Sequence, residues 1–339
     1  MDFGDDRNGE EFMIDRAYGA LIGGAVGDAM GMPASFFTRD KIKRVYGYIT
    51  DFLEPEAKSQ VYHGNLKAGE ITDDTMESII ISNILIKNGG FDRQAFIHEM
   101  RGWAINFNML ESTVIGPSTR KFLEAIIENR EPEETACLSV TNGSAMRVAP
   151  VGVKYYDDIK KSIRVASESS FPSHGSKPCV AAACAVAAAV AAGVKGGYTT
   201  EEVLAFAYEG ALYGESVGCD ITSPSVSKRI LLAKDIVEKN RDKGMSAVLG
   251  ELVGLIGAGM QAYESIPYAL GVFYAVNGHG KEGIIAAING GDDADTNGAI
   301  CGNLCGAYSG AKSLPEEWKK RIEKQSNIDF MAIAKELIK

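Results

Sequence analysis

The chain is poor in the residues that most transition-metal and thiol sites use. Only four of its 339 residues are histidine, and none of its six cysteines belongs to a CxxC motif. Zinc sites depend on closely spaced histidine and cysteine ligands, so the sequence argues against a zinc centre. We expect the cysteines to be buried apolar thiols, and we expect a cytoplasmic protein because the sequence shows no signal peptide.

Basic residues are also in the minority. Lysine and arginine number 35 against 45 aspartate and glutamate, which gives a net charge of −10 and a pI near 5.1. A nucleic-acid partner would require clustered positive charge, although a bound metal ion could still recruit phosphate. The longest apolar run, residues 179–194, is shorter than the roughly 20 residues that a membrane span needs. We therefore expect neither a nucleic-acid nor a membrane partner.

Helical periodicity recurs along most of the chain, and the best alternating run, RVAPVGVKYY, is short. Helices are predicted from residue 14 and then near residues 75–88, 93–107, 118–129, 158–168, 179–194, 201–212, 226–240, 246–258, 265–277, 281–289, 297–310, 315–324 and 329–338. No linker or internal repeat divides the chain. The sequence thus predicts a compact all-α domain at residues 12–339, preceded by a disordered acidic tail at residues 1–11.

Two segments near the N-terminus have unusual compositions. The first predicted helix carries glycines at four-residue spacing, at Gly19, Gly23, Gly27 and Gly31. Each glycine costs up to about 1 kcal/mol in a helix, so we expect another backbone to pack closely against this face. Residues 32–71 appear irregular and rich in aromatics. They are either a lid over a site or a large loop that packs its own aromatic side chains on the surface.

Two further stretches concentrate acidic residues at predicted helix starts. They are ITDDT, which contains Thr72, Asp73 and Asp74, and NGGDDADTNG, which contains Asp292, Asp293, Asp295 and Thr296. Taken alone, ITDDT is typical of a capped helix start, where acids complement the helix dipole. Two carboxylates about 4 Å apart repel by about 4 kcal/mol at an effective dielectric constant of 20, so a buried group needs protons, water or a cation.

Carboxylate and hydroxyl oxygens are hard donors, which suit Mg²⁺ or Mn²⁺ better than zinc. We expect the two stretches to converge on two such ions. A pair of ions could activate water, orient a polyhydroxylated substrate and offset phosphate charge.

Six motifs occur in the order found in the ADP-ribosylglycohydrolases. They are GALIGGAVGDAMGMP, ITDDT, TNGSAMRVAP, SHG, ESIPYAL and GDDADTNGAICGNLCGAYSG. Each motif is weak alone, but together they cover residues 14–324 and the sequence resembles that family. The resemblance implies an all-α orthogonal helix bundle with a binuclear Mg²⁺ or Mn²⁺ centre at the bottom of a cleft.

The resemblance also assigns roles to individual residues. The implied metal ligands are Thr72, Asp73 and Asp74 for one ion and Asp293, Asp295 and Thr296 for the other, with Asp295 as a candidate bridge. The candidate catalytic carboxylates are those of Asp73, Asp74 and Asp293. The implied substrate-binding residues are Asn142, Gly143, Ser144, Arg147 and His174, although His174 is equally well explained as a satisfied histidine at a helix start.

Two positions depart from the family pattern. Many active members carry a glutamate in the lid loop shortly after the GDAxGxP motif, and here Ser35 occupies that position. Asp292 stands where glycine is common, and it either adds a carboxylate beside the metal site or points to solvent.

The expected function is hydrolysis of a ribosyl glycosidic bond in an ADP-ribosylated protein side chain or a small ADP-ribosyl compound. A riboside hydrolase that does not require the ADP moiety is a second hypothesis. Because of Ser35, a catalytically weak ADP-ribose-binding protein is a third.

Overall fold

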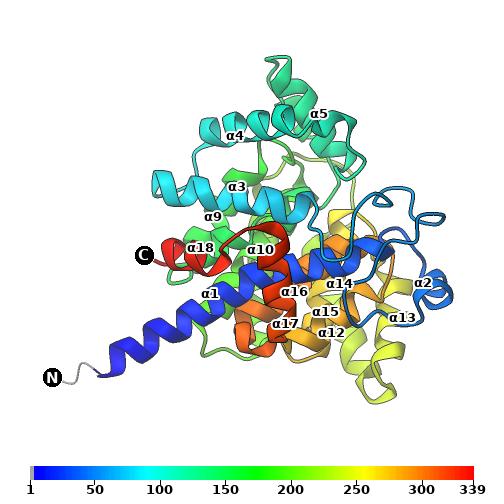
Figure 1. Ribbon diagram of the computed structural model, residues 1–339. Helices are drawn as coiled ribbons and strands as arrows, with labels where there is room; N and C mark the ends of the chain where they lie inside the picture. The colour runs from blue at the N-terminus through cyan, green and yellow to red at the C-terminus, as the bar shows by residue number, and fades with distance from the viewer. Residues whose placement is uncertain (1–3) are drawn as a thin grey trace.

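The computed structural model describes residues 4–339, and these residues form helices and connecting loops with no strand (Figure 1). The first nine helices are α1 (Gly4–Gly31), α2 (Arg39–Tyr46), α3 (Asp73–Asn88), α4 (Arg93–Asn106), α5 (Pro117–Ile127), α6 (Glu133–Ala136), α7 (Gly143–Met146), α8 (Ala149–Lys154) and α9 (Ile159–Ser170). The remainder are α10 (Lys177–Lys195), α11 (Thr200–Val217), α12 (Val226–Asn240), α13 (Met245–Leu255), α14 (Ala262–Ala275), α15 (Gly280–Ile288), α16 (Ala294–Ser309), α17 (Glu316–Ser326) and α18 (Phe330–Leu337).

Every helix predicted from periodicity coincides with an observed helix, so the all-α class is confirmed. The alternating run at residues 147–156 is not a strand, because most of it forms the short helix α8. Residues 149–153 are buried on every side, so the periodicity of their apolar side chains says little about secondary structure. Pro150 lies in the first turn of α8, where its missing N–H costs nothing.

The segment 32–71 is less irregular than its composition suggests. It contains the 3₁₀ turn η1 (Met32–Ala34) and helix α2, whose N-cap Thr38 accepts a hydrogen bond from the Lys41 N–H at 3.2 Å. Residues 47–72 form the remaining loop.

The segment predicted as a tail, residues 1–11, is helical where the structure describes it, because α1 begins at Gly4. Glutamate is a good helix former and no proline interrupts the chain there, so the helix extends upstream. Residues 1–3 lie outside the described part of the chain.

Helices α1 and α16 form the centre of the fold, and their backbones are in direct contact. A Cβ atom built on Gly27 would lie 1.9 Å from the Gly298 carbonyl oxygen, and one built on Gly302 would lie 2.0 Å from the Gly23 carbonyl oxygen. The predicted close approach along the glycine face of α1 is therefore confirmed. Glycines on both helices bring the N-terminal turn of α16 against the C-terminal part of α1.

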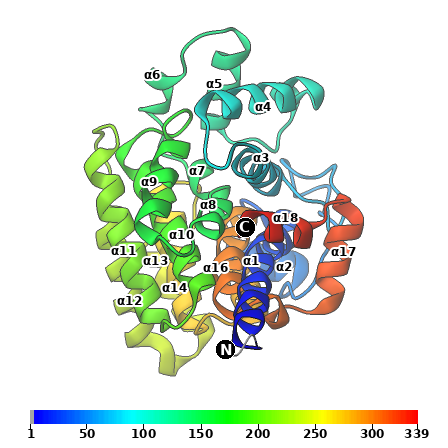
Figure 2. The same cartoon turned by 90° about the vertical axis from the view of Figure 1, so that its left-hand side faces the viewer.

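Helix α10 packs in the core beside α1 and α16 (Figure 2). By length and composition it could cross a membrane, and 94% of its most apolar window is buried inside the fold. Its alanines let neighbouring helices approach closely. Together these helices form a base above which α3, α4 and α5 lie (Figures 1 and 2).

Candidate active site

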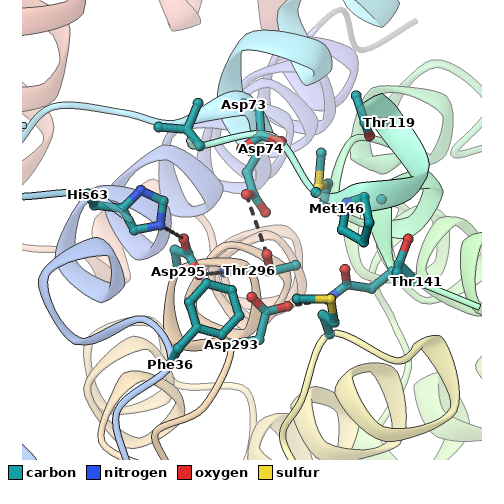
Figure 3. A pocket seen from close by; sticks show the side chains of 16 residues that line it. Phe36, His63, Asp73, Asp74, Thr119, Thr141, Met146, Asp293, Asp295 and Thr296 are labelled. Atoms are coloured by element: carbon teal, nitrogen blue, oxygen red, sulfur yellow. Dashed lines mark hydrogen bonds and ion pairs between the residues drawn. The ribbon is translucent and has the colours of Figure 1, made fainter. Parts of the chain in front are cut away.

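A cavity of about 50 Å³ opens where the first turns of α3 and α16 meet (Figure 3). Its acidic lining comes from both predicted motifs: Asp73, Asp74, Asp293 and Asp295. Hydroxyl groups are supplied by Thr296, Thr119 and Thr141. The Asp74 Oδ2 atom lies 3.4 Å from the Thr296 hydroxyl, although the two residues are 222 positions apart in the sequence. The structure thus brings the two acidic stretches together, as the sequence predicted.

Helix α3 is held at this cavity by a carboxylate that the sequence analysis missed. Asp28 of α1 is fully buried and accepts hydrogen bonds from the Thr72 N–H at 3.0 Å and the Thr72 hydroxyl at 2.8 Å. It also accepts one from the Thr75 hydroxyl. Burial raises the pKa of Asp28 to about 6, although these hydrogen bonds act in the opposite direction. The available signal was the one acid in the apolar, glycine-rich stretch of residues 17–31.

Asn142 positions the start of α16 from across the cavity. Its side-chain amide donates to Asp293 Oδ2 at 2.6 Å and to the Ser265 hydroxyl at 3.0 Å. The hydroxyl of Ser265 in turn donates to the Asn297 side-chain oxygen at 2.8 Å. The orientation of the Asp293 carboxylate is therefore set by a buried chain of amide and hydroxyl groups.

Three of the four carboxyl groups of the cavity resist ionisation. Burial raises the pKa of Asp73 well above its usual range, and the charges of Glu77 and Asp295 raise it further. Burial does the same to the pKa values of Asp74 and Asp293, again reinforced by neighbouring carboxylates. Oδ1 of Asp74 is buried and has no hydrogen-bond partner among the described residues, 4–339. The site therefore combines excess negative charge with an unsatisfied acceptor oxygen.

These donors suit a hard divalent cation, because carboxylate and hydroxyl oxygens from two helix starts surround one space. Within residues 4–339, no group of three or more His, Cys, Asp or Glu side chains is already gathered as a metal site. The fit of the cavity to a divalent cation therefore rests on the type of donor, the raised pKa values and the unsatisfied oxygen of Asp74.

Asp295 differs from the other three carboxylates. Its Oδ2 atom lies 3.0 Å from Nε2 of His63, and its Oδ1 atom accepts the Thr296 N–H at 3.0 Å. Burial raises the pKa of Asp295, but the contacts with His63, Ser35 and Thr296 outweigh this effect and hold the pKa below its usual range. His63 was not among the predicted site residues, since a single histidine in a loop carries no spacing pattern.

The two departures from the family pattern have structural explanations. Ser35 is fully buried, and its hydroxyl accepts the Asp295 N–H at 3.3 Å, so it helps to cap α16 rather than line the cavity. Asp292 is exposed and also lies outside the cavity lining. Its backbone, at φ +55°, pairs with that of Phe37. Asp292 therefore does not supply the acid that position 35 lacks.

The predicted substrate-binding residues divide into two groups. Asn142 and Gly143 line the cavity, whereas Ser144, Arg147 and His174 do not. The hydroxyl of Ser144 donates to the Cys179 carbonyl oxygen at 3.3 Å, behind the cavity wall.

Arg147 is the clearest correction, because its side chain is buried away from the cavity. It is 1% exposed and forms an ion pair with the fully buried Glu77 at 2.6 Å. Its guanidinium also donates to the Ser173 hydroxyl at 2.6 Å and lies over the ring of Phe96 at 4.7 Å. The sequence pattern could not reveal this, because a loop arginine beside glycine and serine also suits phosphate binding.

His174 supports the cavity wall from behind. It is fully buried, with Nε2 3.1 Å from the Thr141 hydroxyl and Nδ1 2.7 Å from the Ser173 hydroxyl. Burial, together with the charge of Arg147, lowers its pKa well below the usual range, so its ring is neutral. A Cβ atom on Gly143 would lie 2.6 Å from Nε2. The interpretation as a satisfied structural histidine therefore holds.

The cysteines also depart from expectation in part. Cys179, Cys184, Cys301 and Cys305 are buried free thiols, as predicted. Cys137 and Cys219, however, form a disulfide across 82 residues, with Cα atoms 5.4 Å apart. The pairing depends on how the segments near residues 137 and 219 are packed, which spacing in the sequence cannot show.

Comparison with known proteins adds an independent observation. Residues 10–339 match the model of the ADP-ribosylglycohydrolase family. The chain belongs to this family. The resemblance inferred from the six motifs is thereby confirmed, and the ADP-ribosylglycohydrolases are hydrolases of ADP-ribose linkages.

Individual relatives in this family match nearly the whole length of the chain. It is 29% identical over 327 residues to the uncharacterized protein YegU of Escherichia coli (strain K12), covering 96% of this chain and 97% of YegU. It is 26% identical over 335 residues to the ADP-ribosylarginine hydrolase Tri1 of Pseudomonas putida (strain GB-1), covering 95% of this chain and 78% of Tri1. A solved ADP-ribosylglycohydrolase-related protein complex is similar at a TM-score of 0.72 and 24% identity. The match covers 96% of this chain and 98% of the solved chain, and it supports the fold.

Proposed function

We propose that the protein is a divalent-cation-dependent hydrolase that cleaves the glycosidic bond at C1 of a ribose in an ADP-ribosyl compound. The observation that carries the proposal is the meeting of two acidic helix starts in one cavity, with an unpartnered buried oxygen on Asp74. Four carboxyl groups in so small a space cannot all stay ionised without a compensating charge.

Two Mg²⁺ or Mn²⁺ ions are the proposed cofactors. The residues that would hold them are Thr72, Asp73, Asp74, Asp293, Asp295 and Thr296. When bound, the ions would offset the carboxylate charge, bind ribose hydroxyls and make a water molecule more acidic.

The chain itself orients the reacting groups. Asn142 holds the carboxylate of Asp293, and Asp28 fixes Thr72 at the start of α3. The transition state of such a hydrolysis resembles an oxocarbenium ion, which the negative side chains of Asp73, Asp74 and Asp293 would stabilise. In the net reaction water adds its oxygen to C1 and the bond to the aglycone breaks. One proton of that water leaves with the aglycone.

The first substrate class to test is ADP-ribosylated arginine, free or on a protein, because the relative Tri1 is named an ADP-ribosylarginine hydrolase. One feature favours a second class. No lysine or arginine is among the described residues that line the cavity. A pyrophosphate would therefore depend on the cations or on backbone N–H groups, whereas a simple riboside would not. A ribonucleoside or related riboside is accordingly the alternative substrate.

The test is a substrate panel with Mg²⁺- or Mn²⁺-loaded protein. It contains ADP-ribosylarginine, ADP-ribosylserine, small ADP-ribosyl compounds and ribonucleosides, with release of ADP-ribose or ribose as the readout. We expect turnover of at least one compound, lost in Asp74→Asn and kept in the matched control Asp292→Asn, whose side chain lies outside the cavity. Tight cation-dependent ADP-ribose binding without any turnover would instead identify a binding protein.

A further inference from the structure

The loop at residues 47–72 reaches the carboxylate centre through the side chain of His63 (Figure 3). His63 is 2% exposed, and its Nε2 atom lies 3.0 Å from Oδ2 of Asp295. A contact this close is favourable only with a proton on Nε2. Within residues 4–339 neither ring nitrogen has a hydrogen bond of good geometry: Nδ1 has no partner, and Nε2 meets Asp295 at ion-pair distance without hydrogen-bond alignment. A buried histidine with this arrangement is not explained by ordinary core packing.

Gln60 fixes the position of His63 relative to the segment that carries Ser35. The side-chain amide of Gln60 lies within hydrogen-bond distance of the Ser35 carbonyl at 3.1 Å and of the carbonyls of η1. Its side-chain oxygen accepts the N–H groups of Tyr62 at 3.1 Å and His63 at 3.5 Å. The ring of Tyr62 meets the ring of Phe36 edge-on, at 4.8 Å between centroids. The loop is therefore docked beside the cavity by polar and aromatic contacts together.

Both carboxylate oxygens of Asp295 are consequently in contact with polar groups of the chain. His63 contacts Oδ2 from the loop, and the Thr296 N–H donates to Oδ1 from α16. The Ser35 hydroxyl accepts the backbone N–H of Asp295, so the chain on the α1 side contributes to the same residue. A carboxylate held in this way presents its remaining lone pairs in one fixed direction.

We infer that His63 is a positioning residue, which orients Asp295 for cation binding and couples that orientation to docking of the loop at residues 47–72. The inference rests on the proposed cation-dependent function. Groups that hydrogen-bond to metal-ligating carboxylates commonly change metal affinity by 10- to 100-fold when removed. In this chain the imidazole of His63 orients the carboxylate of Asp295, whereas Ser35 offers only a hydroxyl beside it.

The experiment measures Mn²⁺ binding to the full-length protein by isothermal titration calorimetry and by the electron paramagnetic resonance signal of the ion. We expect His63→Ala to weaken Mn²⁺ binding by about 10- to 100-fold. His63→Gln should recover most of the affinity, because its side-chain amide can donate to Asp295 at similar reach. His98→Ala, which removes an exposed histidine of α4, is the matched control and should bind as the wild type does.

The outcomes separate this inference from the proposed function. If the wild type binds Mn²⁺ and His63→Ala binds it with equal affinity, the role of His63 is wrong and the proposed function stands. If His63→Gln is as weak as His63→Ala while both keep the wild-type melting temperature, hydrogen-bond donation to Asp295 is not the cause and the inference also fails. A wild type that binds neither Mn²⁺ nor Mg²⁺ overturns the proposed function and the inference with it.

Discussion

Replacement of Arg147 provides a stringent test of the structure, because the sequence pattern and the fold make opposite predictions for it. The Arg147–Glu77 pair is buried, with a distance of 2.6 Å and exposures of 1% and 0%. Removing one partner of such a pair leaves the other charge unpaired, which typically costs about 3–5 kcal/mol. We therefore expect Arg147→Met to lower the free energy of unfolding by that amount. If Arg147 bound substrate instead, stability would hardly change.

A double-mutant cycle distinguishes the ion pair from simple loss of packing. Arg147→Met leaves Glu77 as a buried acid, and burial already raises the pKa of that carboxyl above its usual range. The double replacement Arg147→Met with Glu77→Leu removes both charges, so it should cost much less than the sum of the two single replacements. Loss of the contacts with Phe96 and Ser173 is common to both Arg147 variants and cancels in the comparison.

The assay is equilibrium unfolding in urea, with the midpoint and slope fitted for the wild type, both single variants and the double variant. The expected slope is unchanged, since the fold is the same. A free energy of unfolding for Arg147→Met within about 0.5 kcal/mol of the wild-type value, the range of ordinary surface substitutions, would refute the structural role of the pair. Unchanged stability of Arg147→Met together with a raised KM would indicate that Arg147 binds substrate.

Three further predictions concern the site and its support. Because burial raises the folded-state pKa of Asp74 above the unfolded value near 3.8, metal-free protein should lose stability as the pH rises from about 4 towards neutrality. Saturating Mn²⁺ at 100 times its Kd should restore about 2.7 kcal/mol in thermal unfolding at pH 7, and an equal gain in Asp74→Asn would contradict this. Asp28→Ala should cost about 1–3 kcal/mol in urea unfolding, since the buried donors of Thr72 lose their acceptor; an unchanged midpoint would oppose it. Thiol titration of the denatured, unreduced protein should find four free cysteines, with reduction of the Cys137–Cys219 bond lowering stability by about 2–4 kcal/mol; six free thiols would disprove the pairing.

Local patterns predicted most of the architecture. Amphipathic periodicity located the helices, and the four-residue glycine spacing indicated the close contact of α1 with α16. Thr72 with its following acids, and the acids around Asp293, identified two helix starts. The expectation that these two stretches converge, drawn from their similar form and hard oxygen donors, is confirmed. These properties are visible in sequence because each depends on residues that are close together along the chain.

Other properties of the site depend on contacts between distant segments, and these were missed. Asp28 lies 44 residues before Thr72, and His63 meets Asp295 only because the loop folds back over the cavity. The family resemblance implies that Arg147 lines the cleft together with Asn142 and Gly143. Those two residues do line it, but the side chain of Arg147 points to Glu77 behind the wall. Side-chain direction is set by tertiary packing, which periodicity does not encode.

The most direct test of the account is an anomalous-difference map from a crystal of the protein soaked in Mn²⁺. The account predicts peaks in the cavity between the first turns of α3 and α16, within bonding distance of carboxylate oxygens of Asp74 and Asp295. The same soak of Asp74→Asn should show those peaks weakened or lost. Manganese absent from this cavity in wild-type crystals at saturating concentration would contradict the claim that the two acidic helix starts form one cation site.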